Sequence, residues 1–210
     1  MVFDLDETLV HVNRGAHFKD SEQFVKVLKP NGTEVLVGFN IRPNVVEVLT
    51  DLKAHYNIVL MTASVEAYAT KVLEVLDPDQ TIFQTYVCKE HCLYYKNSKS
   101  VKDLSIFEEV EPGNIVLVDN FSSAFLNQLG NGVPILPYYG VITKVDDEMV
   151  KLGEFLRKVS RAQDVRGVIR KCFFTHLYVN ARDIQRLIMV MREYLEKGMD
   201  QVEEGDLSSG

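Results

Sequence analysis

The sequence contains no tryptophan, only six prolines and only three cysteines, at positions 88, 92 and 172. Three cysteines are too few for the disulfide framework of a small secreted protein, and 210 residues, of which 46% are hydrophobic, can bury a core without crosslinks. Cys88, His91 and Cys92 lie close together, but a zinc site needs four ligands, and Cys172 with His176 is the only further candidate pair. We therefore expect reduced thiols in an intracellular protein, either nuclear or cytoplasmic.

Two further absences limit the partners that we expect. The sequence has no secretory signal and no run of about 20 apolar residues, which a membrane-spanning helix requires. Its 23 Lys and Arg residues are outnumbered by 30 Asp and Glu residues, so the net charge of −7 leaves no excess of cations to neutralise nucleic-acid phosphates. The sequence as given predicts a soluble chain that binds neither membranes nor nucleic acid.

Apolar runs and helical spacing alternate along the chain. The runs predict strands at residues 57–62, 82–87, 92–95, 114–120 and 133–136. Apolar residues at helical spacing predict helices at residues 43–55, 64–77, 149–159 and 164–171. Ser64 is the expected N-cap of the second of these helices. Strands that alternate with helices in this way imply an α/β fold with a Rossmann-like parallel sheet flanked by helices.

An antiparallel hairpin is predicted ahead of the first helix. Residues 24–28 and 34–39 are rich in β-forming side chains, and the Asn31-Gly32 pair between them favours a tight turn. This β insertion, at about residues 12–41, is too short to close over a site as a lid.

The main predicted domain covers residues 1–174, and two further segments follow it. A further helix is expected at residues 175–198, because apolar residues recur at helical spacing between Asn180 and Lys197. Its apolar stripe either docks on its own domain or binds a partner protein. Residues 199–210 are small, polar and acidic and are expected to be disordered. Only Met1 to Phe3 precede Asp4, fewer than a buried strand normally has, which leaves open a natural extension ahead of Met1.

Three apolar runs end in polar side chains, if the apolar residues before Asp4 are the end of a further buried strand. These side chains are Asp4, Thr62 and the pair Asp119-Asn120. If the strands are neighbours in a parallel sheet, their carboxyl ends gather these groups at one edge, where such sheets bind ligands. Asp6 lies two residues beyond Asp4, which would place both carboxylates on one face of a strand. A cation or a shared proton would then have to separate them.

The string from Asp4 to His11, Asp-Leu-Asp-Glu-Thr-Leu-Val-His, resembles the first signature of the haloacid dehalogenase superfamily of phosphotransferases. It is most similar to the phosphatases that act on the C-terminal domain of RNA polymerase II and to their relatives of the Dullard and NLI-interacting-factor type. Thr62, Lys102 and Asp119-Asn120 fit the other three motifs in their usual order. The resemblance fades after about Phe174.

The resemblance implies a Mg²⁺-dependent phosphatase that forms an aspartyl-phosphate. Asp4 would be the nucleophile, and Asp6 would be the general acid that later activates water. Thr62 and Lys102 would bind phosphoryl oxygens. The ion would be bound or supported by Asp4, the backbone carbonyl of Asp6, Asp119 and Asn120. No chemical task follows for His11, which we expect to be structural.

A site with only a hairpin beside it favours a phosphate carried on a flexible protein segment. We therefore expect a phosphoserine or phosphothreonine protein phosphatase, with the RNA polymerase II C-terminal repeat as one candidate substrate by resemblance. Val37 and Phe39 are candidates for a pocket that takes a neighbouring proline, and Lys96 and Lys99 are candidates for contacts with substrate. Two alternatives stay open: a catalytically idle binding module, and a phosphatase of small metabolites.

Overall fold

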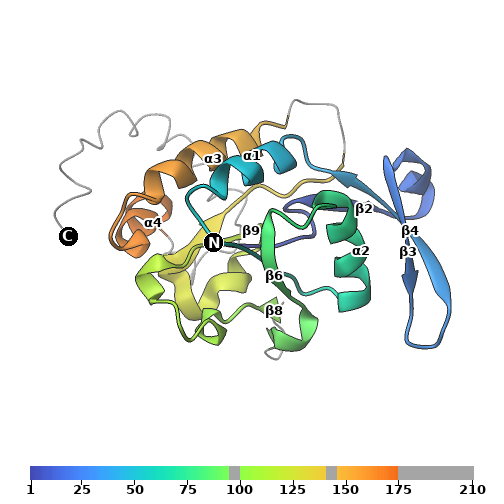
Figure 1. Cartoon of the computed structure of the whole chain (residues 1–210), viewed down its shortest axis with the longest axis horizontal. Coiled ribbons are helices and arrows are strands. Elements are labelled where there is room, and N and C mark those ends of the chain that lie inside the picture. The colour runs from blue at the N-terminus through green and yellow to red at the C-terminus, as the bar shows by residue number, and fades with distance from the viewer. Residues whose placement is uncertain (95–99, 141–145, 175–210) are drawn as a thin grey trace.

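A central sheet of five parallel strands organises the computed structural model, which describes residues 1–94, 100–140 and 146–174 (Figure 1). In spatial order the strands are β10 (Gly132–Pro134), β9 (Leu117–Asp119), β1 (Val2–Phe3), β5 (Ile58–Met61) and β6 (Phe83–Val87). β1 lies in the middle and pairs in parallel with β5 on one side and β9 on the other. The predicted α/β fold with a parallel sheet is thereby confirmed.

In the described part of the chain, four α-helices flank this sheet. They are α1 (Val45–Leu52), α2 (Glu66–Leu76), α3 (Glu148–Val159) and α4 (Val165–Phe173). α1 and α3 pack side by side, and the Tyr56 hydroxyl, just after α1, donates a 2.7 Å hydrogen bond to the carbonyl of Leu156 (Figure 1). None of the described helices combines the length and the apolar character needed to cross a bilayer.

The insertion after β1 forms a second, antiparallel sheet. Its strands are β2 (Val10–Asn13), β4 (Glu34–Ile41) and β3 (Gln23–Leu28), in that spatial order. The hairpin expected around Asn31-Gly32 is confirmed as β3 and β4. β2 was not predicted, because a run of four residues is too short to stand out in the sequence, and pairing with β4 orders it. In Figure 1 this sheet projects from the body of the molecule, and β3 packs against α2.

Short elements complete the fold. A two-stranded ladder joins β7 (Leu93–Tyr94) to β8 (Ser100–Val101). The 3-10 segments are η1 (Gly15–Asp20), η2 (Lys89–His91), η3 (Leu104–Ile106), η4 (Pro112–Asn114) and η5 (Ser122–Asn131). The helix predicted at 175–198, the tail at 199–210, Lys96 and Lys99 all lie outside the described residues.

Three local predictions are wrong. α1 begins at Val45 rather than at Pro43, because Asn44 adopts the left-handed conformation with φ 63°. Ser64 does not cap α2: Val65 occupies the N-cap position, and no side chain caps this helix. β1 ends at Phe3, so Asp4 and Asp6 do not share one face of a strand.

Candidate active site

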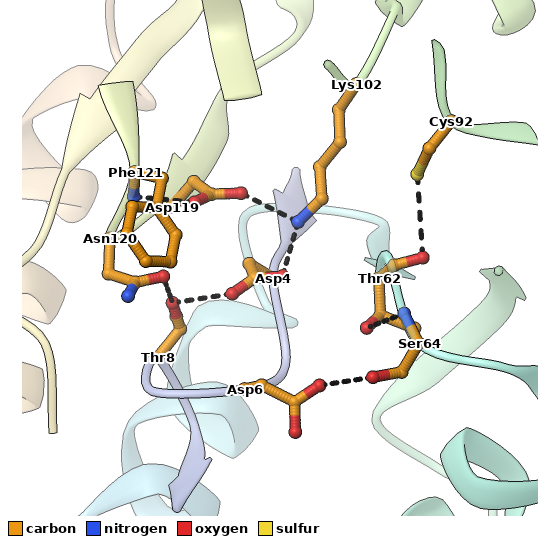
Figure 2. Close-up of polar contacts among 10 residues, drawn as sticks. All are labelled: Asp4, Asp6, Thr8, Thr62, Ser64, Cys92, Lys102, Asp119, Asn120 and Phe121. Carbon is orange, nitrogen blue, oxygen red and sulfur yellow. Dashed lines mark hydrogen bonds and ion pairs between the residues drawn. The ribbon is translucent and has the colours of Figure 1, made fainter. Parts of the chain in front are cut away.

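The carboxyl ends of β1, β5 and β9 bring the predicted polar side chains to one place (Figure 2). Phe3 of β1 is in register with Val118 of β9, and the backbone N–H of Asp4 donates to the carbonyl of Val118 at 3.0 Å. Asp4 therefore lies beside Asp119, while Thr62 at the end of β5 lies on the other side of Asp4. Asp4 is 7% exposed and Thr62 is 1% exposed, so both side chains are buried at the end of the sheet.

Lys102 places a cation between two carboxylates. Its Nζ donates to Oδ1 of Asp4 and, at 2.7 Å, to Oδ2 of Asp119. Burial by itself would lower the pKa of Lys102, but the charges of Asp119 and Asp4 outweigh burial and raise this pKa. Burial, followed by the charge of Asp4, raises the pKa of Asp119 despite the attraction of Lys102. Lys102 therefore faces two acidic side chains at once in a buried site.

Thr8 joins the first signature to Asn120. Its hydroxyl lies 3.0 Å from Oδ2 of Asp4 and 3.3 Å from Oδ1 of Asn120. The backbone carbonyl of Thr8 in turn accepts a 3.1 Å hydrogen bond from Nη1 of the buried Arg42. Sequence reasoning assigned no role to Thr8, although it belongs to the signature string, because its partner Asn120 lies 112 residues away in the chain.

Asp6 turns away from this trio. Ser64 donates to its Oδ2 at 2.6 Å, and the phenol of Tyr68 on α2 donates to its Oδ1 at 2.7 Å. Burial raises the pKa of Asp6 and the charge of Asp4 adds to the rise, while the hydrogen bonds from Ser64 and Tyr68 act in the opposite direction. Lys102 contacts Asp4 and Asp119 rather than Asp6, so it is not the cation expected between the two signature carboxylates.

The oxygen atoms around Thr8 are of the kind that Mg²⁺ prefers. Oδ2 of Asp4 and Oδ1 of Asn120 lie close together because both contact the same hydroxyl. Within the described ranges, no three His, Cys, Asp or Glu side chains are arranged to hold a metal together. Mg²⁺ commonly takes one or two carboxylates and fills its other positions with waters and substrate phosphate. The donors fit such an open site rather than a cage of carboxylates.

A groove of about 1580 Å³ leads from Asp6 along the insertion sheet. Ser64 and Tyr68 line it near Asp6, and Val37 lines it on β4. Phe39 is completely buried, so the prediction that it forms a pocket for substrate is wrong. His11 also lines the groove, with its ring edge-on to Tyr138 and Tyr139 at centroid distances of 6.5 and 6.0 Å.

The chain is similar to known phosphatases over most of its length. The family model described as NLI interacting factor-like phosphatase matches residues 1–166. CTD small phosphatase-like protein 3 of Caenorhabditis elegans is 32% identical over 171 residues, which are 81% of this chain and 58% of that protein. The chain therefore spans little more than half the length of this relative.

Two other matches are a protein with a different name and a solved structure. The mitochondrial import inner membrane translocase subunit TIM50 of Kluyveromyces lactis is 34% identical over 105 residues, or 49% of this chain and 21% of that protein. Among solved structures, the fission yeast RNA polymerase II CTD phosphatase Fcp1 aligns with 99% of this chain and 66% of its own chain. The TM-score is 0.55 at 15% identity, which shows a common fold.

Proposed function

The chain belongs to the NLI interacting factor-like phosphatases, and we propose that it is a Mg²⁺-dependent phosphatase of phosphoserine and phosphothreonine in proteins. The observation that carries this proposal is the position of Asp4. Its carboxylate lies at the carboxyl end of the central strand, between the ammonium group of Lys102 and the hydroxyl of Thr8. These contacts hold the side chain in one orientation, as an attacking group requires.

In the first step, an oxygen of Asp4 attacks phosphorus and forms an aspartyl-phosphate, while the bond from phosphorus to the seryl or threonyl oxygen breaks. Asp6 gives its proton to the departing oxygen. Lys102, freed from the charge of Asp4 as the new bond forms, offsets charge on the phosphoryl oxygens. Thr62 donates its hydroxyl hydrogen to one of them, since its oxygen accepts from the backbone N–H of Ser64 at 3.0 Å.

In the second step, water attacks the same phosphorus, the bond from phosphorus to the Asp4 oxygen breaks, and Asp6 takes up the proton that this water loses. Inorganic phosphate leaves, and Asp4 and Asp6 return to their starting states. Asp4 and Asn120, with the backbone carbonyl of Asp6, would hold Mg²⁺, and Asp119 would support them. The bound ion supplies positive charge that stabilises the phosphoryl group during transfer.

The groove beside Asp6 supports a protein substrate. Its volume of about 1580 Å³ is larger than the roughly 300–1,000 Å³ of a small-molecule pocket, and its apolar wall at Val37 suits a residue next to the phosphorylated one. The C-terminal domain of RNA polymerase II is one candidate, because relatives and a structural neighbour carry its abbreviation in their names. The helix predicted at 175–198 stays a candidate for binding a partner protein.

A catalytically idle binding module is the second candidate, and the match to a translocase subunit favours it. One assay separates the candidates: phosphate release from an aryl phosphate and from phosphopeptides, with and without Mg²⁺, by the parent and by Asp4→Asn. The proposal predicts Mg²⁺-dependent turnover of both substrates that Asp4→Asn abolishes. No turnover by the parent would support the idle module, and turnover of phosphorylated metabolites but never of phosphopeptides would support a metabolite phosphatase.

A further inference from the structure

Both carboxylate oxygens of Asp6 are held by hydroxyl groups that no signature motif contains. Ser64 donates to Oδ2 at 2.6 Å and Tyr68 donates to Oδ1 at 2.7 Å. The two donors come from different elements, since Ser64 lies in the connection after β5 and Tyr68 lies on α2. Hydrogen bonds from two separate elements hold both oxygens of the Asp6 carboxylate, so the carboxylate is kept from rotating about its last bond.

Ser64 is itself held firmly by its backbone. Its N–H donates to Oγ1 of Thr62 at 3.0 Å, and its carbonyl accepts from the backbone N–H of Lys89 at 3.1 Å. Tyr68 is only 9% exposed, so its ring is fixed by packing. The hydroxyls of Ser64 and Tyr68 therefore occupy set positions, and Asp6 takes its orientation from them.

The orientation of Asp6 is distinct from that of Asp4. Figure 2 shows the Asp6 carboxylate directed toward Ser64, on the far side of Asp4 from Lys102. Asp4 contacts Lys102 and Thr8, whereas the side chain of Asp6 accepts hydrogen bonds from Ser64 and Tyr68. The two carboxylates of the signature are thus kept apart by two separate sets of contacts, although they are two residues apart in the chain.

We propose that Ser64 and Tyr68 are positioning residues that orient Asp6 for proton transfer to the departing seryl or threonyl oxygen. This inference rests on the proposed function. An alkoxide is a poor leaving group and needs a proton as the bond to phosphorus breaks, whereas a nitrophenolate leaves without one. Misplacing Asp6 therefore slows the first step for phosphoserine and spares it for nitrophenyl phosphate.

The test compares Ser64→Ala and Tyr68→Phe with the parent by kcat/KM, which reports the first phosphoryl transfer. On a phosphoserine peptide each variant is expected to lose at least about tenfold, a part of what a positioned acid contributes. On 4-nitrophenyl phosphate each is expected to change less than about threefold. Ser64→Thr keeps a hydroxyl and is expected to restore the peptide activity. An equal loss on both substrates, or no loss on either, overturns the proposal.

Two matched controls remove a hydroxyl away from Asp6. The Tyr86 phenol bonds Glu66 at 3.1 Å on the surface, and the Ser160 hydroxyl bonds the carbonyl of Arg157 at 2.9 Å at the end of α3. Tyr86→Phe and Ser160→Ala are expected to leave both kcat/KM values unchanged. A selective loss of peptide activity in either control contradicts an effect that acts through Asp6.

A crystal structure of the Ser64→Ala, Tyr68→Phe double variant tests directly whether these two residues set the orientation of Asp6. The Asp6 carboxylate is expected to rotate away from its place in the parent, and an unmoved carboxylate overturns the proposal even if the parent has no activity. If the parent hydrolyses neither substrate, the proposed phosphatase function is wrong. The kinetic result therefore tests the function, and the crystal structure tests the positioning role separately.

Discussion

The ammonium group of Lys102 lies 2.7 Å from Oδ2 of Asp119 while it also contacts Oδ1 of Asp4. All three side chains are buried, and they come from segments that are far apart in the chain. The same cation faces both acidic side chains, which offsets part of the cost of burying them together. The integrity of the site and the stability of the fold therefore depend on one lysine.

Lys102→Met leaves two buried carboxylates facing each other. We expect a loss of about 3–5 kcal/mol in the free energy of unfolding, which urea titration measures. Burial and the charge of Asp4 raise the pKa of Asp119, and without Lys102 little opposes them, so the folded state binds a proton at Asp119 more tightly than the unfolded state. The loss should therefore shrink as the pH is lowered. Lys71→Met is the control, because Lys71 pairs with Glu74 on the surface and its removal should cost less than about 1 kcal/mol. Equal losses in the two variants would contradict the role given to Lys102.

Thr8→Val removes the hydroxyl shared by Asp4 and Asn120 and keeps the side-chain shape. The apparent affinity for Mg²⁺ in the phosphatase assay is expected to fall about 10–100-fold, because partners that orient metal ligands contribute on this scale. The free energy of unfolding should fall by about 1 kcal/mol. Thr8→Ser supplies the same hydroxyl and should restore the Mg²⁺ dependence. A Mg²⁺ titration that is identical for Thr8→Val and the parent would rule out this role.

Val37→Thr changes the apolar wall of the groove by replacing a methyl group with a hydroxyl. The KM for a phosphoserine–proline peptide is expected to rise about fivefold, equivalent to about 1 kcal/mol of lost apolar contact. The KM for an aryl phosphate should stay the same, because that substrate does not extend along β4. Leu28→Thr is the control, since Leu28 lies exposed on the same hairpin outside the groove lining. Parallel changes for both substrates would show that the groove does not hold the peptide.

Asp103, next to Lys102, makes stability depend on acid pH. The backbone N–H of Ser105, helped by the side chains of Gln128 and Asn127, lowers the pKa of Asp103 to about 2. A lowered folded-state pKa stabilises the protein above the unfolded pKa, and this contribution disappears as the pH falls from about 4 to about 2.

Asp103→Asn should therefore lower the urea midpoint at neutral pH and flatten its fall across this acid window. The exposed Asp79 offers a matched control, and Asp79→Asn should follow the parent curve. An acid profile of Asp103→Asn that coincides with that of the parent would contradict the pKa shift.

The sheet was predictable because its signals are local. Apolar runs such as residues 57–62 mark buried strands wherever they occur, and polar residues at their ends, such as Thr62, mark the binding edge. The signal for the hairpin was equally local, because the Asn31-Gly32 pair by itself favours a tight turn between two strands. The family resemblance rested on the same short strings and agrees with the family model.

Features that depend on tertiary contacts were not predictable. Ser64 has the sequence position of a helix cap, yet its hydroxyl contacts Asp6, which lies 58 residues earlier. β2 forms only because β4 offers an edge to pair with. Phe39 follows the alternation of its strand, but burial by the rest of the fold decides that it faces the core rather than the groove. The chemical roles of Asp4, Asp6, Thr62 and Lys102 stay predictions that activity measurements must test.

Trapping the phosphorylated enzyme tests the central claim most directly. Asp6→Asn removes the group that activates water, while an aryl phosphate still reacts without a proton donor, so the aspartyl-phosphate should accumulate. After an acid quench, mass spectrometry is expected to find one phosphoryl group on the peptide that contains Asp4, removable by hydroxylamine and absent from the Asp4→Asn, Asp6→Asn double variant. Release of phosphate by the parent with no phosphoryl group ever found on Asp4, or release by Asp4→Asn at the parent's rate, would contradict the account.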